Sequence, residues 1–180
     1  MLLPIVSPAA IAASLRRFRR NRHGSAAVEF ALVAPIFFAL IFAIIETSLV
    51  FFAGQVLETG NQDTARLILT SQVKTQADYK QYLCDRISVL MTCANVDIDV
   101  RSYPAGTAFT IKDPIVGGVY TPNFVYQLPT PGSNETTVAR AFYQWPLIVT
   151  QLGYNIANIF NGNPANNKRL LASTAAVRQQ

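Results

Sequence analysis

The chain has 180 residues, of which 51% are hydrophobic, and this size and composition fit one domain together with a membrane-spanning segment. Its net charge of +5 lies in residues 1–24, which hold five arginines and no acidic residue, whereas residues 25–180 hold ten basic and ten acidic residues. Because the excess charge is confined to one short segment, the composition argues against a basic nucleic-acid-binding face, and no nucleic-acid partner is expected.

The first 15 residues are apolar but too short, and too interrupted by Pro4 and Pro8, to cross a membrane. They precede the charged segment, whereas the charged region of a secretory signal comes first, so we assign them no function. The arginines that follow predict that this end of the chain stays in the cytoplasm and that the rest is exported. These topology residues are Arg16, Arg17, Arg19, Arg20 and Arg22.

Residues 30–53 form an apolar segment of the length that a membrane-spanning helix needs, with Glu46 as its only charged residue. Pro35 removes one helical hydrogen bond, which predicts either a bend without a role or a packing site in a helix bundle. Glu46 is expected at the outer interface of the bilayer. A rough helical stripe continues beyond the membrane, so the pattern predicts one long helix from about Ala26 to Ser71.

Glu29 is the unusual residue of this region, because a carboxylate inside a membrane helix costs about 2.5 to 3.5 kcal/mol. One interpretation is that headgroups at the bilayer interface solvate it. However, Glu29 also lies five residues after Gly24, which ends the basic segment, and Phe30 follows it. This combination resembles the processing site of prepilins, in which a prepilin peptidase would cut between Gly24 and Ser25.

Residues 16–73 as a whole resemble the TadE-like minor pilins, or pseudopilins, of tight-adherence (Tad or Flp) type IV pili, and the rest of the chain resembles them more loosely. The resemblance implies a structural component of pilus biogenesis and surface adhesion in the bacterial inner membrane, with a cytoplasmic N-terminus and a periplasmic head. It implies as partners other pilins and pseudopilins, the prepilin peptidase, the inner-membrane assembly platform and membrane lipid. The expected assembly residues are Glu29, Pro35 and Glu46. Cleavage would give Ser25 a cationic amino group, with which Glu29 of a neighbouring subunit could pair.

A turn at residues 74–77 precedes a predicted amphipathic helix, Tyr79 to Met91, with Asp78 as a candidate N-cap. The apolar face of this helix consists of Tyr79, Leu83, Ile87 and Leu90. Cys84 and Cys93 are the two cysteines of the chain, and export would place both where disulfides persist. A disulfide between them is the first interpretation, and two buried free thiols are the alternative.

Residues 96–101 alternate between apolar and polar side chains, which predicts a strand with Asp97 and Asp99 on its solvent-exposed face. Residues 103–134 are dense in proline and glycine and predict a long loop that contacts a partner, with short strands at 108–111 and 124–127. Residues 136–144 and 169–178 also have extended character, which predicts two further strands.

The expected fold is α+β, a long N-terminal transmembrane, pilin-like helix followed by a small head with a short helix and an antiparallel sheet of about three strands. The strands are expected at 96–102, 136–144 and 169–178. The expected domains are a leader at 1–24 that is removed, a transmembrane and assembly helix at 25–53, and an exported head at 54–180.

The sequence gives no support for catalysis. His23, the single histidine, lies in the leader, and the chain has no phosphate-binding glycine motif and no cysteine cluster with zinc spacing. We therefore expect no cofactor, no metal and no enzyme activity. The alternative to a pilus component is a single-span, membrane-anchored extracytoplasmic binding or sensor module, and an unrecognised membrane-tethered enzyme is a third class. Cleavage after Gly24 separates the first class from the other two.

Overall fold

The computed structural model describes residues 24–108, 110–149, 154–160 and 167–178. The chain divides into two compact units, residues 1–41 and 42–180. The leader arginines and His23 lie outside the described residues, so the topology prediction stays a prediction.

Helix α2, Ser25–Leu69, has 45 residues and confirms the predicted long helix to within two residues at each end. Pro35 lies inside the helix without ending it. The helix stops where Ser71 adopts a left-handed backbone conformation, with φ of 54°, and the Gln72 N–H donates to the Leu67 carbonyl at 3.1 Å. This bond satisfies one of the carbonyls that a helix end leaves without a partner.

In the first unit, the described residues 24–41 are helical from Ser25, and their large apolar side chains are exposed. Those side chains are Val28, Phe30, Leu32, Val33, Ile36, Phe37, Phe38 and Leu40. Among the described residues, α2 is the one helix long and apolar enough to cross a membrane, and none of its most apolar 18-residue window is buried. The helix therefore fits a single-pass membrane anchor.

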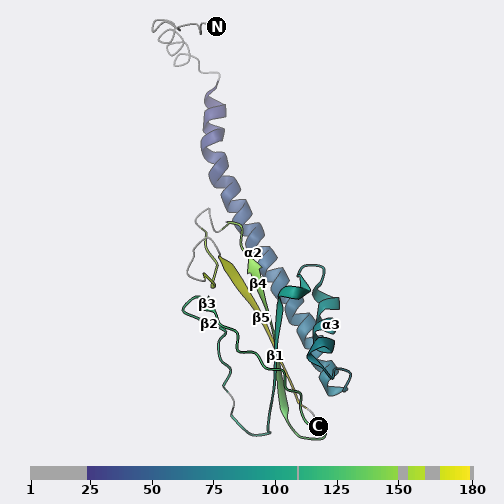
Figure 1. The fold of residues 1–180 in the computed structure, drawn as a ribbon. Helices are drawn as coiled ribbons and strands as arrows, with labels where there is room; N and C mark the ends of the chain where they lie inside the picture. The colour runs from purple at the N-terminus through teal and green to yellow at the C-terminus, as the bar shows by residue number, and fades with distance from the viewer. Residues whose placement is uncertain (1–23, 109, 150–153, 161–166, 179–180) are drawn as a thin grey trace, which may run out of the picture. The chain divides into compact units, whose positions relative to one another are not determined.

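The second unit contains a three-stranded antiparallel sheet in the order β1-β4-β5 (Figure 1). The strands are β1, Val96–Tyr103; β4, Thr136–Pro146; and β5, Lys168–Arg178. They confirm the predicted sheet and its α+β class. A two-stranded hairpin of β2, Ile115–Val116, and β3, Val119–Tyr120, was not predicted.

One face of the sheet carries the main core. Val100 pairs with Ala139 in the register, and Ile98 pairs with Ala141, so these side chains share a face. They are buried together with Leu57 of α2 and with side chains of the following helix, α3, Gln76–Ile87. Figure 1 shows α2 and α3 on the same side of the sheet. The buried side chains of α2 from Val50 to Ile68 therefore belong to the core of the second unit.

Helix α3, Gln76–Ile87, begins earlier and ends earlier than predicted. Its N-cap is Thr75, not Asp78: the Thr75 hydroxyl accepts from the Asp78 N–H, and the Asp78 carboxylate accepts in return from the Thr75 N–H at 2.9 Å. This reciprocal pair is a capping box. Hydrogen bonds from Thr75 and Lys74 lower the pKa of Asp78. The predicted face is otherwise confirmed, because Tyr79, Leu83 and Ile87 are all buried. A short 3-10 helix, η1, Cys93–Asn95, leads into β1.

The segment between β1 and β4, below called the covering segment, pairs with the free edge of β1 near Tyr126, and other parts of it cover the second face of the sheet. Its described residues near 108–111 form no strand, so that prediction is wrong, but Tyr126 forms a parallel bridge with Val100. The Val100 N–H donates to the Val125 carbonyl, and the Gln127 N–H donates to the Val100 carbonyl, both at 2.8 Å. Phe124 also stacks on Phe142 of β4, with ring centroids 4.9 Å apart.

This covering segment makes the predicted solvation of Asp99 wrong. Asp99 is fully buried, and its carboxylate accepts hydrogen bonds from Arg140 and Arg101 and from the Val125 N–H. Asp97 is half-buried and accepts from the Tyr120 hydroxyl at 2.8 Å. The alternation along β1 correctly placed Asp97 and Asp99 on the face opposite to the main core, but that face lies under the covering segment and is not exposed to solvent.

Candidate functional site

The predicted processing residues lie at the start of α2. Ser25 is the first residue of the helix, and the Gly24 carbonyl accepts from the Val28 N–H at 3.1 Å. Gly24 is exposed, and a Cβ built on it meets no other heavy atom within 4 Å. The peptide bond between Gly24 and Ser25 therefore lies next to a glycine with open space around its α-carbon.

Glu29 lies one turn into α2 and is exposed, as is Phe30 after it. Among the described residues, no group donates a hydrogen bond to the Glu29 carboxylate or forms an ion pair with it. A carboxylate surrounded by exposed apolar side chains needs a counter-charge if water is removed from around it. The described part of the chain does not supply that counter-charge.

Glu46 lies in a different environment. Its side chain is 7% exposed, and its carboxylate accepts from the backbone N–H groups of Ile148 and Val149, the latter at 3.1 Å from both oxygens. These amides lie 102 and 103 residues later in the chain. Sequence patterns gave no sign of this contact. Glu46 thus joins α2 to the segment after β4, and the structure does not bring it together with Glu29.

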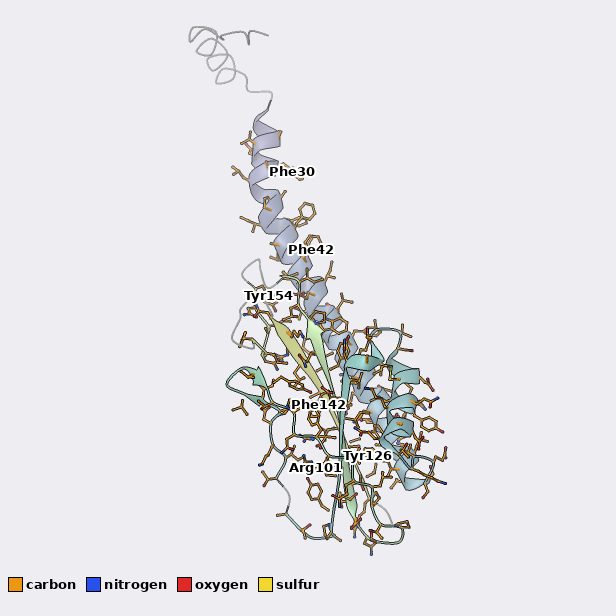
Figure 2. All side chains as sticks on the ribbon, viewed as in Figure 1. Phe30, Phe42, Arg101, Tyr126, Phe142 and Tyr154 are labelled. Atoms are coloured by element: carbon orange, nitrogen blue, oxygen red, sulfur yellow. A yellow bond between two sulfur atoms is a disulfide. The ribbon has the colours of Figure 1, made fainter. Side chains whose placement is uncertain are left out.

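One residue further along α2, the Thr47 hydroxyl lies 3.3 Å from the Tyr154 hydroxyl. Figure 2 shows Tyr154 beside the part of α2 that follows Phe42. The two residues border a groove of about 510 Å³ between α2 and β5, lined mainly by apolar groups. Phe51, Glu58 and Arg169 also line it. The groove was not predicted, because its walls come from three distant stretches of the chain.

Residues 24–66 match the family model described as TadE-like protein. This segment is TadE-like. No curated protein matches the chain, and no solved structure matches it. The match confirms the predicted resemblance of this part of the chain to the TadE-like family. It starts at Gly24, covers the exposed part of α2 with Glu29 and Pro35, and ends inside the part of α2 that packs in the head.

The end of the TadE-like segment carries a buried polar contact to the sheet. The Asn61 side-chain amide donates to the Ala139 carbonyl of β4 at 3.1 Å, and its oxygen accepts from the Tyr79 hydroxyl at 2.8 Å. Burial raises the pKa of Tyr79 above its usual range, so the hydroxyl stays protonated and can donate. Because both Asn61 groups have partners, this residue fixes the position of α2 on β4 and of α3 on α2.

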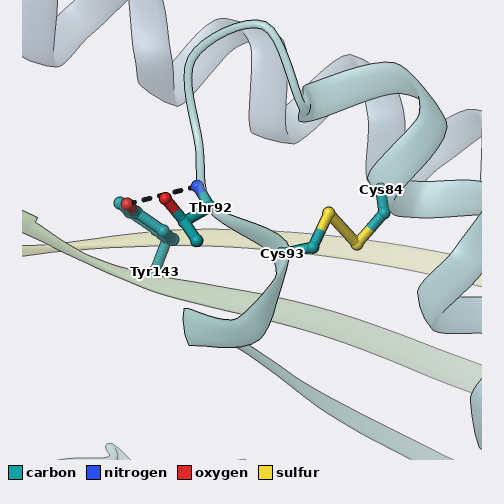
Figure 3. The surroundings of a disulfide bond; sticks show 4 residues. All are labelled: Cys84, Thr92, Cys93 and Tyr143. Atoms are coloured by element: carbon teal, nitrogen blue, oxygen red, sulfur yellow. Dashed lines mark hydrogen bonds between the residues drawn. A yellow bond between two sulfur atoms is a disulfide. The ribbon is translucent and has the colours of Figure 1, made fainter.

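Beyond the TadE-like segment, Cys84 and Cys93 form the predicted disulfide, with α-carbons 5.6 Å apart (Figure 3). The bridge connects α3 to η1. Next to it, the Thr92 N–H donates to the Tyr143 hydroxyl of β4 at 3.5 Å. The two contacts hold the link between α3 and β1 against the sheet.

Acidic and basic groups also meet in a buried cluster around Asp99. Arg140 Nε donates to Asp99 at 3.0 Å, Arg101 Nε donates to it at 2.9 Å, and both arginines also donate to carbonyls of the covering segment. Every group here has a partner within the fold, so the cluster attaches the covering segment to the sheet. Within the described ranges, no group of three His, Cys, Asp or Glu side chains could hold a metal ion.

Proposed function

We propose that the chain is a minor pilin or pseudopilin of a tight-adherence (Flp-type) pilus, a structural component that takes part in pilus assembly. It is held in the bacterial inner membrane by α2, with its N-terminus in the cytoplasm and its head in the periplasm. The observation that supports this most is the exposed start of α2, where Gly24 and Glu29 precede apolar side chains that nothing in the described chain covers. The family match begins at the same glycine.

The proposed assembly step uses two charges that are separate in a single chain. A prepilin peptidase removes residues 1–24, and the new Ser25 amino group is mostly cationic near neutral pH. When α2 helices of neighbouring subunits pack together, Glu29 of one subunit pairs with the Ser25 amine of the next. This pairing removes two isolated charges from an apolar environment at once. The exposed apolar side chains of α2 then contact lipid before assembly and other pilins and pseudopilins after it.

Under this proposal residues 25–53 serve in the membrane and in assembly, and residues 54–180 form the exported head. The peptidase and the inner-membrane assembly platform act on the first part. The head is held to the same helix by its core and by the two bonds to Glu46. Movement of α2 into a pilus would therefore carry the head with it.

The test is substitution of Gly24, because a large side chain next to the scissile bond would crowd the peptidase. Gly24→Leu is expected to leave the precursor at full length in the inner membrane, as measured by intact mass of the extracted protein. Gly54→Leu is the matched control, because Gly54 also has open space around its α-carbon but lies far along the helix. The control is expected to be processed. A wild-type N-terminus at any residue other than Ser25 would contradict the proposal.

A further inference from the structure

The head and the exposed apolar part of α2 overlap along the helix. Bonds to Glu46 place the backbone of Ile148 and Val149 at the level of that residue. Yet α2 still exposes large apolar side chains beyond it: Phe51 is 71% exposed and Phe52 is 57% exposed. Six residues separate Glu46 from Phe52, which corresponds to about 9 Å of helix. A bilayer that covers Phe52 therefore also reaches the nearest end of the head.

Glu46 does not prevent such coverage. A free carboxylate at this position would favour water and set the limit of the membrane. In the structure its side chain is almost fully buried, and both oxygens accept hydrogen bonds from backbone N–H groups. Charge-assisted bonds of this kind replace water around the carboxylate. The surface at this level is consequently formed by the exposed apolar side chains of Ile44, Ile45 and Leu49, together with Thr47 and Ser48, whose hydroxyls donate to carbonyls of the helix itself.

The end of the head at this level has the composition of a membrane interface. Ile148 is 81% exposed although the backbone next to it is fixed by Glu46. Tyr154 exposes part of its ring and keeps its hydroxyl near Thr47. Residues 141–167 contain no charged side chain at all. Tyrosine and other amphipathic aromatic side chains are enriched at the level of lipid headgroups.

We propose that this end of the head lies in the headgroup region of the bilayer. Its contact surface, here called the collar, consists of Phe51, Phe52, Ile148 and Tyr154. The partner is the phospholipid surface itself, and the inference rests on the proposed function in that α2 must span the membrane. The head is then held at a fixed depth, with its sheet extending away from the lipid. A second copy of the chain is the competing occupant of the collar, and the test separates the two.

The experiment places a fluorescent probe on the collar. The full chain is reconstituted in phosphatidylcholine vesicles that contain lipids brominated near the carbonyl end of the acyl chains, which quench indole fluorescence on contact. The probe is Ile148→Trp in a Trp145→Phe background, because Trp145 is the only tryptophan. The matched control is Val89→Trp in the same background. Val89 is 87% exposed and lies two residues after Ile87, which packs next to Gly60 of α2. Gly60 lies 14 residues, or about 21 Å, beyond Glu46 along the helix, so the control probe is far from the collar.

Ile148→Trp is expected to show at least about twofold more quenching than Val89→Trp, with emission shifted to shorter wavelength, since only the former reaches lipid. Equal quenching of the two variants would overturn the proposal. A second result would also overturn the proposal: an emission shift without quenching, which disappears when the protein-to-lipid ratio is lowered about tenfold. That result would identify a second copy of the chain as the occupant of the collar. If Trp145→Phe does not fold, the difference between Ile148→Trp and the parent protein gives the same comparison.

Failure of this proposal can be distinguished from failure of the proposed function. The same vesicles are tested for whether the protein stays membrane-bound in high salt and alkali, which reports insertion of α2. Cells are tested for an N-terminus at Ser25, which reports processing. Firm insertion and processing combined with an unquenched Ile148→Trp probe would reject the collar alone.

Discussion

Residues 26–45 and residues 50–68 belong to one helix but differ in what covers them. The first stretch is the more apolar, and its large side chains are exposed. The second stretch contains Asn61 and Thr64, and both are fully buried. Burial inside the chain therefore does not follow hydrophobicity along α2. The first stretch is suited to contacts with lipid or with other helices, whereas the second is stabilised by its own head.

The same contrast applies to the two acidic residues Glu29 and Glu46. Glu29 is exposed and has no partner among the described residues, whereas Glu46 is buried and accepts bonds from two amides. The comparison predicts that substitutions in the first stretch of α2 affect assembly and leave the head folded. Substitutions around the second stretch should lower the stability of the head.

The largest expected effect is that of Glu29→Ala on assembly. The variant should insert and be cleaved, but its neighbour's amine would lack a partner at a cost of about 3 to 5 kcal/mol, which corresponds to at least about 100-fold less incorporation. Pilus counts and co-purification with other pilus proteins measure this. Glu58→Ala is the control, because Glu58 lies in the same helix and its one hydrogen bond among the described residues comes from Gln62. Wild-type pilus numbers in Glu29→Ala would remove the distinction between the two stretches.

Asp99→Asn should have the opposite character, with normal processing and a less stable head. The substitution leaves the buried Arg140 guanidinium without its counter-charge, and we expect a loss of about 3 to 5 kcal/mol in the free energy of unfolding. Chemical denaturation of the purified protein measures it. Asp97→Asn is the control: this half-buried side chain accepts a neutral hydrogen bond, so we expect a loss of about 1 kcal/mol. Equal losses would show that burial of Asp99 is unimportant.

Removal of the disulfide should have a smaller effect. The Cys84→Ser, Cys93→Ser double variant opens a loop closed across a sequence separation of nine, and the expected loss is about 2 to 3 kcal/mol. Denaturation of the variant and of the wild type, with and without reductant, measures it. Reductant should lower wild-type stability to that of the variant and leave the variant unchanged. Two free thiols in the denatured, unreduced wild type would refute the bridge.

The smallest effects are expected from substitutions of two glycines of α2, and the two substitutions should change the stability in opposite directions. A Cβ at Gly60 would lie 3.0 Å from Ile87 Cγ2 and 3.2 Å from Leu83 Cδ1, so Gly60→Leu should push α3 away and cost about 1 to 3 kcal/mol. Gly54→Leu meets open space and should stabilise the helix by about 0.5 to 1 kcal/mol. Thermal unfolding of both variants measures the pair. A stabilising Gly60→Leu would contradict close packing of the two helices.

The elements of this fold could be predicted because their signals are local. The uncharged run from Phe30 to Ile45, the stripe of α3 and the alternation of β1 each identify an element from neighbouring residues. The Gly24 and Glu29 motif is equally local. Its use cannot be read from one chain, because the proposed counter-charge belongs to another subunit, so the processing and assembly roles stay predictions.

What sequence reasoning missed depends on contacts between distant residues. Alternation shows that Asp99 and Ile98 point to opposite faces, but it does not show that a later segment covers the face of Asp99. A polar residue in a helix reads as exposed, and Asn61 is buried only because it bonds to Ala139, 78 residues later. Glu46 was placed at an interface by hydrophobicity, and its amide partners have no side-chain signature.

The strand order has a consequence for when the head can fold. Strand β4 is central, and its partner β5 comes from residues 168–178, the last described stretch of the chain. Until those residues are available, β4 exposes one hydrogen-bonding edge over its 11 residues, and the core lacks Leu171 and Ala175. Long-range pairing of this kind is slow and leaves an aggregation-prone intermediate. Completion of the sheet therefore waits for the synthesis of residues 168–178, because β4 and β5 can pair only after those residues are present.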